Sequence, residues 1–189
     1  ASASLATMME DMYEEVVGTV VTEFIPPQSI EDQWDIAGLE KALAADFKMD
    51  IPVKAWLDAD DRLEENSLRA KIGEAAREAY RQTRTKMGEE VANMIEHQIM
   101  LQVLDRHWKE HLAAMDYLRQ GIHLRGYAQK NPEQEYKREA FQLFQQLLGA
   151  VKLEVVQTIA TIHIPSEEEI AAAQAQQTAQ MAAMEMHME

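Results

Sequence analysis

A zinc-site motif is the first chemistry that the sequence offers, because His107, Glu110 and His111 fit the H-x-x-E-H pattern of inverted zinc metallopeptidases. Histidines four residues apart share one face of a helix and can bind a metal, while the glutamate acts as a base. A third ligand is also needed, and the downstream acid considered, Glu154, lies on a plain amphipathic helix. Five-residue patterns of common residues arise by chance. The preferred interpretation is a solvated helix face with Trp108 turned toward a neighbouring helix, and no metal ligand is predicted.

A glycine pair has the spacing of a phosphate-binding loop. Gly121 and Gly126 fit G-x-x-x-x-G, but Tyr127 and Ala128 follow where such a loop needs lysine and then serine or threonine. The sequence has no cysteine, which excludes a thiolate zinc site and a cysteine nucleophile, and it has no nucleophile elbow. We therefore predict no catalytic residue, no cofactor site and no enzymatic activity for this chain by itself.

The same loop has the residue types of a contact surface. Arg125 and Lys130 place positive charge around it, and Leu124 and Tyr127 stand where polar side chains are more usual. A tyrosine can stack, bury area and hydrogen-bond, so it can hold varied chains without reading their sequence. The pattern supports a second interpretation equally well, in which Leu124 and Tyr127 fold back against the helices that flank the loop.

The composition predicts an all-α protein. Seven glycines and five prolines in 189 residues are too few for the many tight turns of a β-rich chain. The formal net charge of −15 argues against non-specific nucleic-acid binding, because phosphates would be repelled. Residues 1–70 contain 16 acidic and 5 basic residues, whereas residues 71–165 contain 12 acidic and 13 basic ones. No apolar run is long enough for a transmembrane segment.

Apolar periodicity and breaker residues predict a small, irregular helical module followed by a long antiparallel hairpin. The first expected helix, residues 5–24, ends at a pair of prolines, and Ser29 with Asp32 is expected to cap the next segment. Gly88 is expected to be the joint between two longer helices. The remaining expected helices are residues 34–47, a short one after 51–53, 63–87, 89–120 and 132–162, and the large residues of the module, expected in its core, are Trp34, Phe47, Trp56 and Leu57.

The two last helices form the expected hairpin, with arms roughly 45 Å long. Asn131 is expected to cap the second arm, with Pro132 in its first position. We place domain limits at 1–88 and 89–163, and interpret 164–189 as the flexible, low-complexity start of a linker. The apolar stripe expected on the first arm consists of Val91, Ile95, Ile99, Leu101, Leu104, Trp108, Leu112, Met115 and Leu118.

About 150 residues of the sequence, roughly 10–160, resemble the SecA family, the ATP-driven motors of bacterial preprotein translocation. This unbroken similarity is far more specific than either short motif. The resemblance explains Trp108–His111, which includes most of the H-x-x-E-H motif, without any metal there. The segments that carry it are Ile25–Ser29, Trp34–Leu39, Ala55–Asp58 and, above all, Trp108–Glu139.

The resemblance implies the identity of the parts. Residues 1–88 would be the helical wing domain, and residues 89–163 the C-terminal part of the helical scaffold domain, a two-helix finger that also regulates ATP hydrolysis. In the family the finger reaches into the mouth of the SecY channel, and its tip tyrosine, here Tyr127, contacts the moving polypeptide. Leu124, Arg125 and Lys130 are expected to contribute to the same contact.

The resemblance also implies partners and location. The nucleotide-binding domains, which bind ATP and magnesium in the family, and the preprotein cross-linking domain have no counterpart in this sequence. The expected partners are the SecY channel complex, an unfolded preprotein and the remaining SecA domains, with monomer and homodimer of the parent both open. The expected location is cytoplasmic, peripheral at the inner face of the bacterial plasma membrane.

Other functions stay open at this point. The apolar stripes and the methionine-rich composition also suit a helical interaction or oligomerisation module that works alone, with holdase-like binding. A zinc hydrolase is a weaker alternative, and nucleic-acid binding the weakest.

Overall fold

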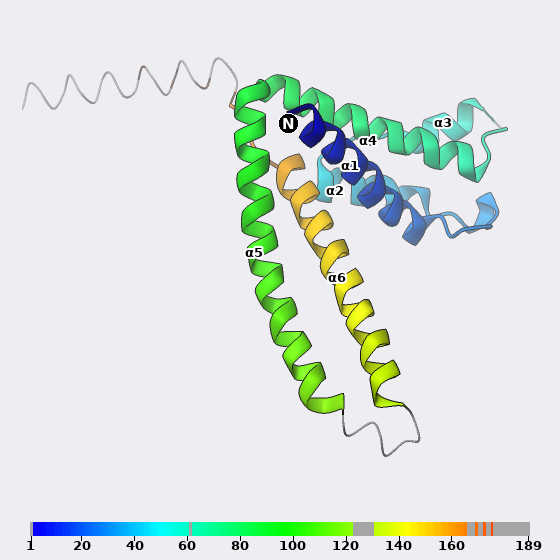
Figure 1. The fold of residues 1–189 in the computed structure, drawn as a ribbon. Coiled ribbons are helices and arrows are strands. Elements are labelled where there is room, and N and C mark those ends of the chain that lie inside the picture. The colour runs from blue at the N-terminus through cyan, green and yellow to red at the C-terminus, as the bar shows by residue number, and fades with distance from the viewer. Residues whose placement is uncertain are drawn as a thin grey trace, which may run out of the picture.

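The structure, a computed structural model, describes residues 2–60, 62–122 and 131–165, together with residues 169, 172 and 175. These residues form six α-helices and one 3-10 turn, without a strand among them, which confirms the all-α prediction. Four helices form a body, from which the last two extend as a long hairpin (Figure 1). The helices are α1 (Ser2–Phe24), α2 (Ile36–Phe47), α3 (Val53–Ala59), α4 (Glu65–Met87), α5 (Glu89–Gly121) and α6 (Pro132–Ala160), with the 3-10 turn at Glu31–Gln33.

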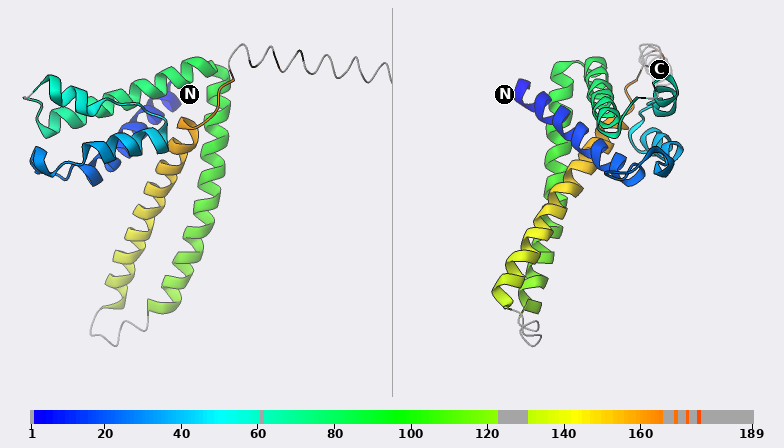
Figure 2. Two further views of the ribbon diagram at one scale, coloured as in Figure 1. Left: turned by 180° about the vertical axis from the view of Figure 1, so that it is seen from behind. Right: turned by 90° about the vertical axis from the view of Figure 1, so that its right-hand side faces the viewer.

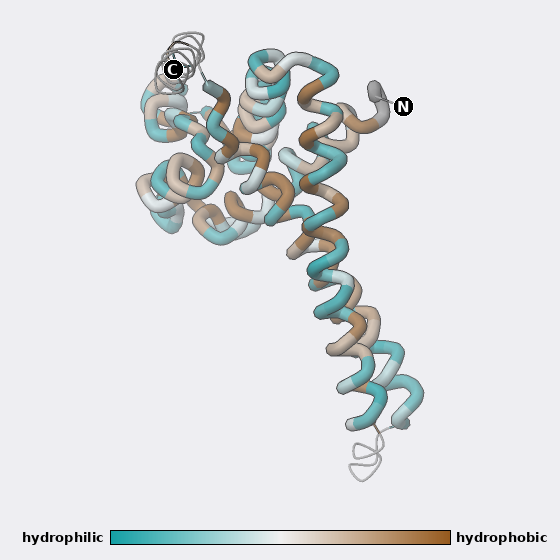
Figure 3. Tube along the Cα trace, turned by 90° about the vertical axis from the view of Figure 1, so that its left-hand side faces the viewer, coloured by the Kyte–Doolittle hydropathy of each residue, from teal (hydrophilic) through white to brown (hydrophobic). Residues whose placement is uncertain are grey.

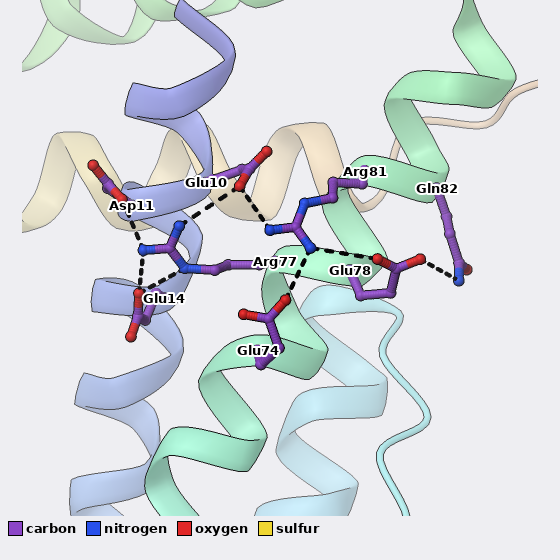
Figure 4. A network of polar contacts seen from close by, with 8 residues as sticks. All are labelled: Glu10, Asp11, Glu14, Glu74, Arg77, Glu78, Arg81 and Gln82. Atoms are coloured by element: carbon purple, nitrogen blue, oxygen red, sulfur yellow. Dashed lines mark hydrogen bonds and ion pairs between the residues drawn. The ribbon is translucent and has the colours of Figure 1, made fainter.

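In the body, α1 and α4 lie side by side and run in opposite directions. Their contact is apolar inside and ionic at its rim (Figure 4). Arg77 of α4 reaches Asp11 and Glu14 of α1 at 2.8 and 2.7 Å, and Arg81 reaches Glu10 at 2.9 Å. The hydrogen bonds that the two arginines donate to carboxylates raise the pKa of both arginines. The ion pairs are still accessible to solvent, with Arg77 and Glu10 half-buried and Arg81 more open, so they align the two helices more than they stabilise them.

In the segment between α1 and α2, the helix cap predicted at Ser29 is wrong. Ser29 does not cap a helix: its hydroxyl accepts a hydrogen bond from Trp34 Nε1 at 2.8 Å and donates to the carbonyl of Pro26. The cap of α2 is Asp35, whose Oδ1 accepts from Gly38 N at 2.9 Å. The serine is already occupied by the indole, and the helix starts only after Asp35.

The core of the body joins α1–α4 to the base of the hairpin. Phe47 and Leu57 are buried in it as expected, whereas Trp34 and Trp56 are half-buried at its edge. Each tryptophan keeps a polar or charged neighbour there, such as Lys71, whose Nζ lies 4.3 Å from the ring centre of Trp56. The buried contributions of the hairpin to this core are Val103 of α5 and Val155, Val156 and Ile159 of α6.

Gly88 alone separates α4 from α5, as predicted, and it has a φ of +82° that side-chain-bearing residues rarely adopt. From this joint α5 runs away from the body, and α6 returns beside it to pack against α1 and α2 (Figures 1 and 2). The helix lengths, 33 and 29 residues, correspond to arms of about 50 and 44 Å. The hairpin therefore holds its far end well outside the body.

The apolar stripe predicted on α5 is only partly correct. Leu118 is buried, but five members are exposed, and Ala92, Val103 and the charged Glu96 are buried without having been expected. The reason is that α5 packs on α4 near the joint and on α6 farther out, so no single face is buried along its whole length. The five exposed members are Val91, Leu101, Leu104, Trp108 and Leu112.

Candidate functional site

The far end of the hairpin is the candidate site. Its four predicted contact residues, Leu124, Arg125, Tyr127 and Lys130, lie outside the described residues, between Ile122 and Asn131. The two flanking residues are described, and both belong to the hairpin end that is farthest from the body (Figure 2). The structure thus shows the two helix ends between which the predicted contact residues lie in the sequence.

The last turn of α5 has an exposed polar face and a buried apolar face. Leu118 and Ile122 are buried, whereas Arg119 and Gln120 are exposed. Arg119 and Gln120 both bond Asp116, at 2.6 and 2.7 Å. The charge of Arg119 is therefore compensated within its own helix.

The start of α6 is fixed by a capped first turn. Asn131 Oδ1 accepts hydrogen bonds from the backbone N–H groups of Glu133 and Gln134 at 3.0 and 3.4 Å, and Pro132 occupies the first helical position, as predicted. Glu133 also pairs with Lys137 at 2.7 Å, and this lysine lowers the pKa of its carboxyl group. Glu133 lies at the positive end of the helix dipole, which also stabilises the first turn. Helix α6 therefore begins at a defined residue.

We expect Asn131→Ala to destabilise the start of α6 by about 1 kcal/mol, because two backbone N–H groups lose their acceptor. Hydrogen exchange of the amides of residues 133 and 134 should accelerate about fivefold to tenfold. Asn131→Asp is the matched control, since it keeps an acceptor at the cap and should exchange like the parent. Equal acceleration in both variants would contradict the assigned role of Asn131.

A shallow cleft lies between the two arms next to this end. On one side Tyr117 and Leu118 of α5 contribute to it, and on the other Leu143 and two glutamines of α6, Gln142 and Gln146. The side chain of Tyr117 is 81% exposed. Sequence reasoning gave this residue no role, although a tyrosine next to a stripe residue, Leu118, on an amphipathic helix was a signal that could have identified it.

The histidine motif has a structural explanation in the hairpin. His107 Nε2 lies 2.6 Å from Glu154 Oε2 on α6, while its Nδ1 lies 3.6 Å from Glu110. The two carboxylates therefore face opposite edges of one imidazole ring, and Arg106 also pairs with Glu154. Within the described part of the chain, no group of three or more potential ligands is placed to hold a metal ion.

His111 has a different environment from His107. Its ring lies 5.4 Å from that of Trp108 and 6.3 Å from that of Phe144 on α6. Trp108 itself is exposed, so the expectation that it turns into the contact between the arms is wrong. The motif serves the packing of α5 on α6 through two separate contacts.

Large apolar side chains stay exposed along both arms of the hairpin. Apolar and polar residues alternate along it outside the body (Figure 3). An exposed apolar surface of this extent is typical of a surface that another protein covers. Its members are Val91, Met94, Leu101, Leu104, Trp108, Leu112 and Tyr117 of α5 and Phe141, Phe144, Leu148 and Leu153 of α6.

None of the helices among the described residues combines the length and the apolar character that crossing a membrane requires.

Comparison with known proteins finds relatives that match the whole chain. The family described as "SecA Wing and Scaffold domain" matches residues 1–163. Proteins named "Protein translocase subunit SecA" match all 189 residues: the one from Acinetobacter baumannii is 52% identical, that from Acinetobacter baylyi 53%, and that from Psychrobacter cryohalolentis 52%. The chain spans about a fifth of the length of these relatives (20–21%).

Proposed function

The chain belongs to the SecA wing and scaffold family, and we propose that it supplies the wing and the two-helix finger of a protein translocase motor. In this proposal the body (α1–α4) lies within the wing domain, residues 1–88, and the hairpin (α5 and α6) forms the finger, residues 89–163. The finger couples ATP-driven motion of the whole subunit to a polypeptide that enters the SecY channel, and it regulates ATP hydrolysis. The single observation that carries the proposal is the hairpin, whose end stands far from the body.

The mounting of the hairpin suits a mechanical role. At its base, Val103, Val155 and Ile159 are buried in the core of the body, and Lys152 of α6 pairs with Glu15 of α1 at 2.6 Å. An α-helix resists bending over a few turns, so a movement of the body is carried to the far end without much loss. The end then moves as a unit with the rest of the subunit.

The proposed contact with the polypeptide consists of Tyr127 with Leu124 beside it. A tyrosine offers a flat apolar ring and one hydroxyl group, which allows it to grip unfolded chains of different sequence. Arg125 and Lys130 provide positive charge toward the channel mouth or the polypeptide. We assign the cleft that contains Tyr117 to the same surface, because it lies between the two arms and includes Gly121, the last residue of α5.

ATP and magnesium belong in this proposal to parts of the subunit outside the chain. The residues present do not fit a phosphate loop, because Gly126 is followed by Tyr127 and Ala128 rather than by lysine and a hydroxyl residue. We therefore derive no chemical step for the chain and assign it no catalytic residue.

The exposed apolar side chains of the hairpin suit the partners proposed for it. The remaining SecA domains would cover the surface around Leu101 and Leu104, and the channel complex and the preprotein would meet the far end. The subunit would act at the cytoplasmic face of the bacterial plasma membrane as a peripheral protein.

The same surface supports one alternative, a helical module that oligomerises or binds unfolded chains by itself. Light scattering of the purified chain distinguishes the two functions. A stable oligomer whose mass does not change with concentration would favour the alternative, whereas a monomer would favour the finger.

The proposal is tested by a photo-crosslinking amino acid at position 127 of the complete subunit, with a preprotein stalled in the channel. We expect adducts to the stalled preprotein, and a change in their yield when ATP is added. The same amino acid at position 55, an exposed residue of α3 in the body, is the control and should give none. Adducts at position 127 to the subunit alone would mean that Tyr127 folds back, and the proposed contact would be wrong.

A further inference from the structure

The contact between the two arms changes character where the hairpin leaves the body. Inside the body, Val103 of α5 and Val155 of α6 are buried in the core. Outside it, residues 104–117 of α5, all of them described, include no buried side chain, and Leu147 is the only buried one among residues 132–154 of α6. The outer arms therefore share little apolar packing that could fix their relative position.

One carboxylate joins the arms at this boundary. Glu154 of α6 directly precedes Val155 in the sequence. It faces Arg106 and His107, which follow Val103 by about one turn of α5. Its Oε1 accepts a hydrogen bond from Arg106 Nη2, and its Oε2 lies 2.6 Å from His107 Nε2. Because two adjacent residues of α5 bind the two oxygens, the contact fixes both the axial position and the rotation of α6 relative to α5.

The surroundings of this contact strengthen it. The side chains of His107 and Glu154 are 18% and 33% exposed, so the pair is partly shielded from water. A hydrogen bond to a charged group is stronger in such a place than at an open surface. The other ring nitrogen, His107 Nδ1, lies 3.6 Å from Glu110, so carboxylates of two helices hold the ring at opposite edges.

Beyond the contact, the space between the arms is only partly filled. A shallow cleft lined by His111, Leu147 and their neighbours opens directly beyond it, and the cleft with Tyr117 lies nearer the far end. The rings of His111 and Phe144 meet edge-on, with their centres 6.3 Å apart. Such contacts leave the arms room to slide or roll, so a directional contact has to set their register.

We propose that Glu154, together with Arg106 and His107, is a register lock that holds the outer arms in one axial position and one rotation. Glu154 is then a positioning residue, because it determines how the helix ends on either side of the far loop lie relative to each other. Without the lock the base of the hairpin stays buried in the body, but the outer arms slide and roll. Only the use of a locked hairpin in transport rests on the proposed function; the lock itself is a property of the chain.

The lock can be tested in the chain by a distance measurement across the outer arms. The sequence has no cysteine, so Ala113→Cys on α5 and Gln145→Cys on α6, both at exposed positions beyond the lock, give a single pair of spin labels. Double electron–electron resonance should show one narrow distance distribution in the otherwise unchanged chain. In Glu154→Met the distribution should widen about twofold, because few buried contacts then hold the outer arms.

Three further variants make the result specific. Asp105→Met removes a carboxylate next to Arg106 that pairs with Lys109 of its own helix at 2.6 Å, and it should leave the distribution narrow. Glu154→Gln keeps the length of the side chain and one acceptor oxygen, so it should give an intermediate width. Arg106→Glu combined with Glu154→Arg reverses the ion pair and should restore the narrow distribution.

The melting temperature separates a lock from a contact that merely stabilises the fold. We expect Glu154→Met to lower it by less than about 4 °C, since a partly exposed ion pair contributes little to stability. A larger fall with loss of the helix signal would make Glu154 a stability residue, and the proposal would be wrong.

Three results of the distance measurement would also overturn the proposal. An unchanged width in Glu154→Met would mean that other contacts set the register. Equal widening in Asp105→Met would mean a general effect of charge, and widening that the reversed pair does not repair would mean that the ion pair is not the cause. All of these results are independent of crosslinking at position 127, so failure of the lock and failure of the proposed function can be told apart.

Discussion

Replacing Tyr127 with alanine in the complete translocase subunit is expected to slow preprotein transport about tenfold, which corresponds to ~1.4 kcal/mol of lost interaction. The physical reason is that an aromatic anchor carries a large share of the energy of a contact, and no neighbour in the loop offers an equivalent ring. The measurement is the rate of preprotein uptake into membrane vesicles, with circular dichroism of the variant recorded beside it.

Two matched variants make this result specific. Tyr127→Phe keeps the ring and should retain most of the rate, because the ring supplies most of the buried area. Tyr117→Ala removes the exposed tyrosine of the adjacent cleft and should have a smaller effect, since it lies on α5 about one turn before the helix ends, outside the loop. Unchanged transport in Tyr127→Ala, or a loss of helix signal together with the loss of transport, would contradict the proposed contact.

The helical elements of this fold could be predicted from local signals. One proline pair follows the end of α1, Gly88 separates α4 from α5, and Asn131 with Pro132 begins α6. Each is a backbone effect that depends on residues close in sequence. The predicted cap at Ser29 is wrong for an equally local reason: a tryptophan five residues away forms a hydrogen bond with the serine hydroxyl group.

The packing partners could not be predicted in the same way. Periodicity counts apolar residues, so it misses Glu96, which is buried only because Tyr80 and Arg84 across the joint satisfy it. It also assigns Leu101 and Leu104 to a buried face, although both are exposed in the described chain. The apolar residues of α5 thus contact more than one neighbouring element, and a single sequence does not show which residue contacts which element.

In the candidate site, too, features that depend on residue type could be predicted, whereas features that depend on tertiary packing could not. The loop residues, such as Tyr127, were identified by residue type and by resemblance, and they stay predictions because they lie outside the described residues. Tyr117 was missed because its exposure depends on where α6 passes, which is a property of the tertiary structure.

The second large effect is expected in the body, where Phe47→Ala should lower the free energy of unfolding of this chain by about 3–5 kcal/mol. Phe47 is the last residue of α2 and is 2% exposed. It lines one small cavity together with Tyr13 of α1, Ala79 of α4 and Ala160 of α6, so its ring fills the space where the body meets the base of the hairpin. Removal leaves a void that four helices would have to close together.

Urea unfolding followed by circular dichroism measures this effect as a shift of the midpoint at constant slope. The control is Ile30→Ala, an aliphatic side chain that is 65% exposed, which should change stability by no more than about 0.5 kcal/mol. A total stability of about 5–15 kcal/mol is usual for a domain, so the loss at Phe47 is a large fraction of it. If both variants lost the same amount, the hairpin would not be anchored in the body through α2, and the mechanical coupling proposed for it would lose its structural basis.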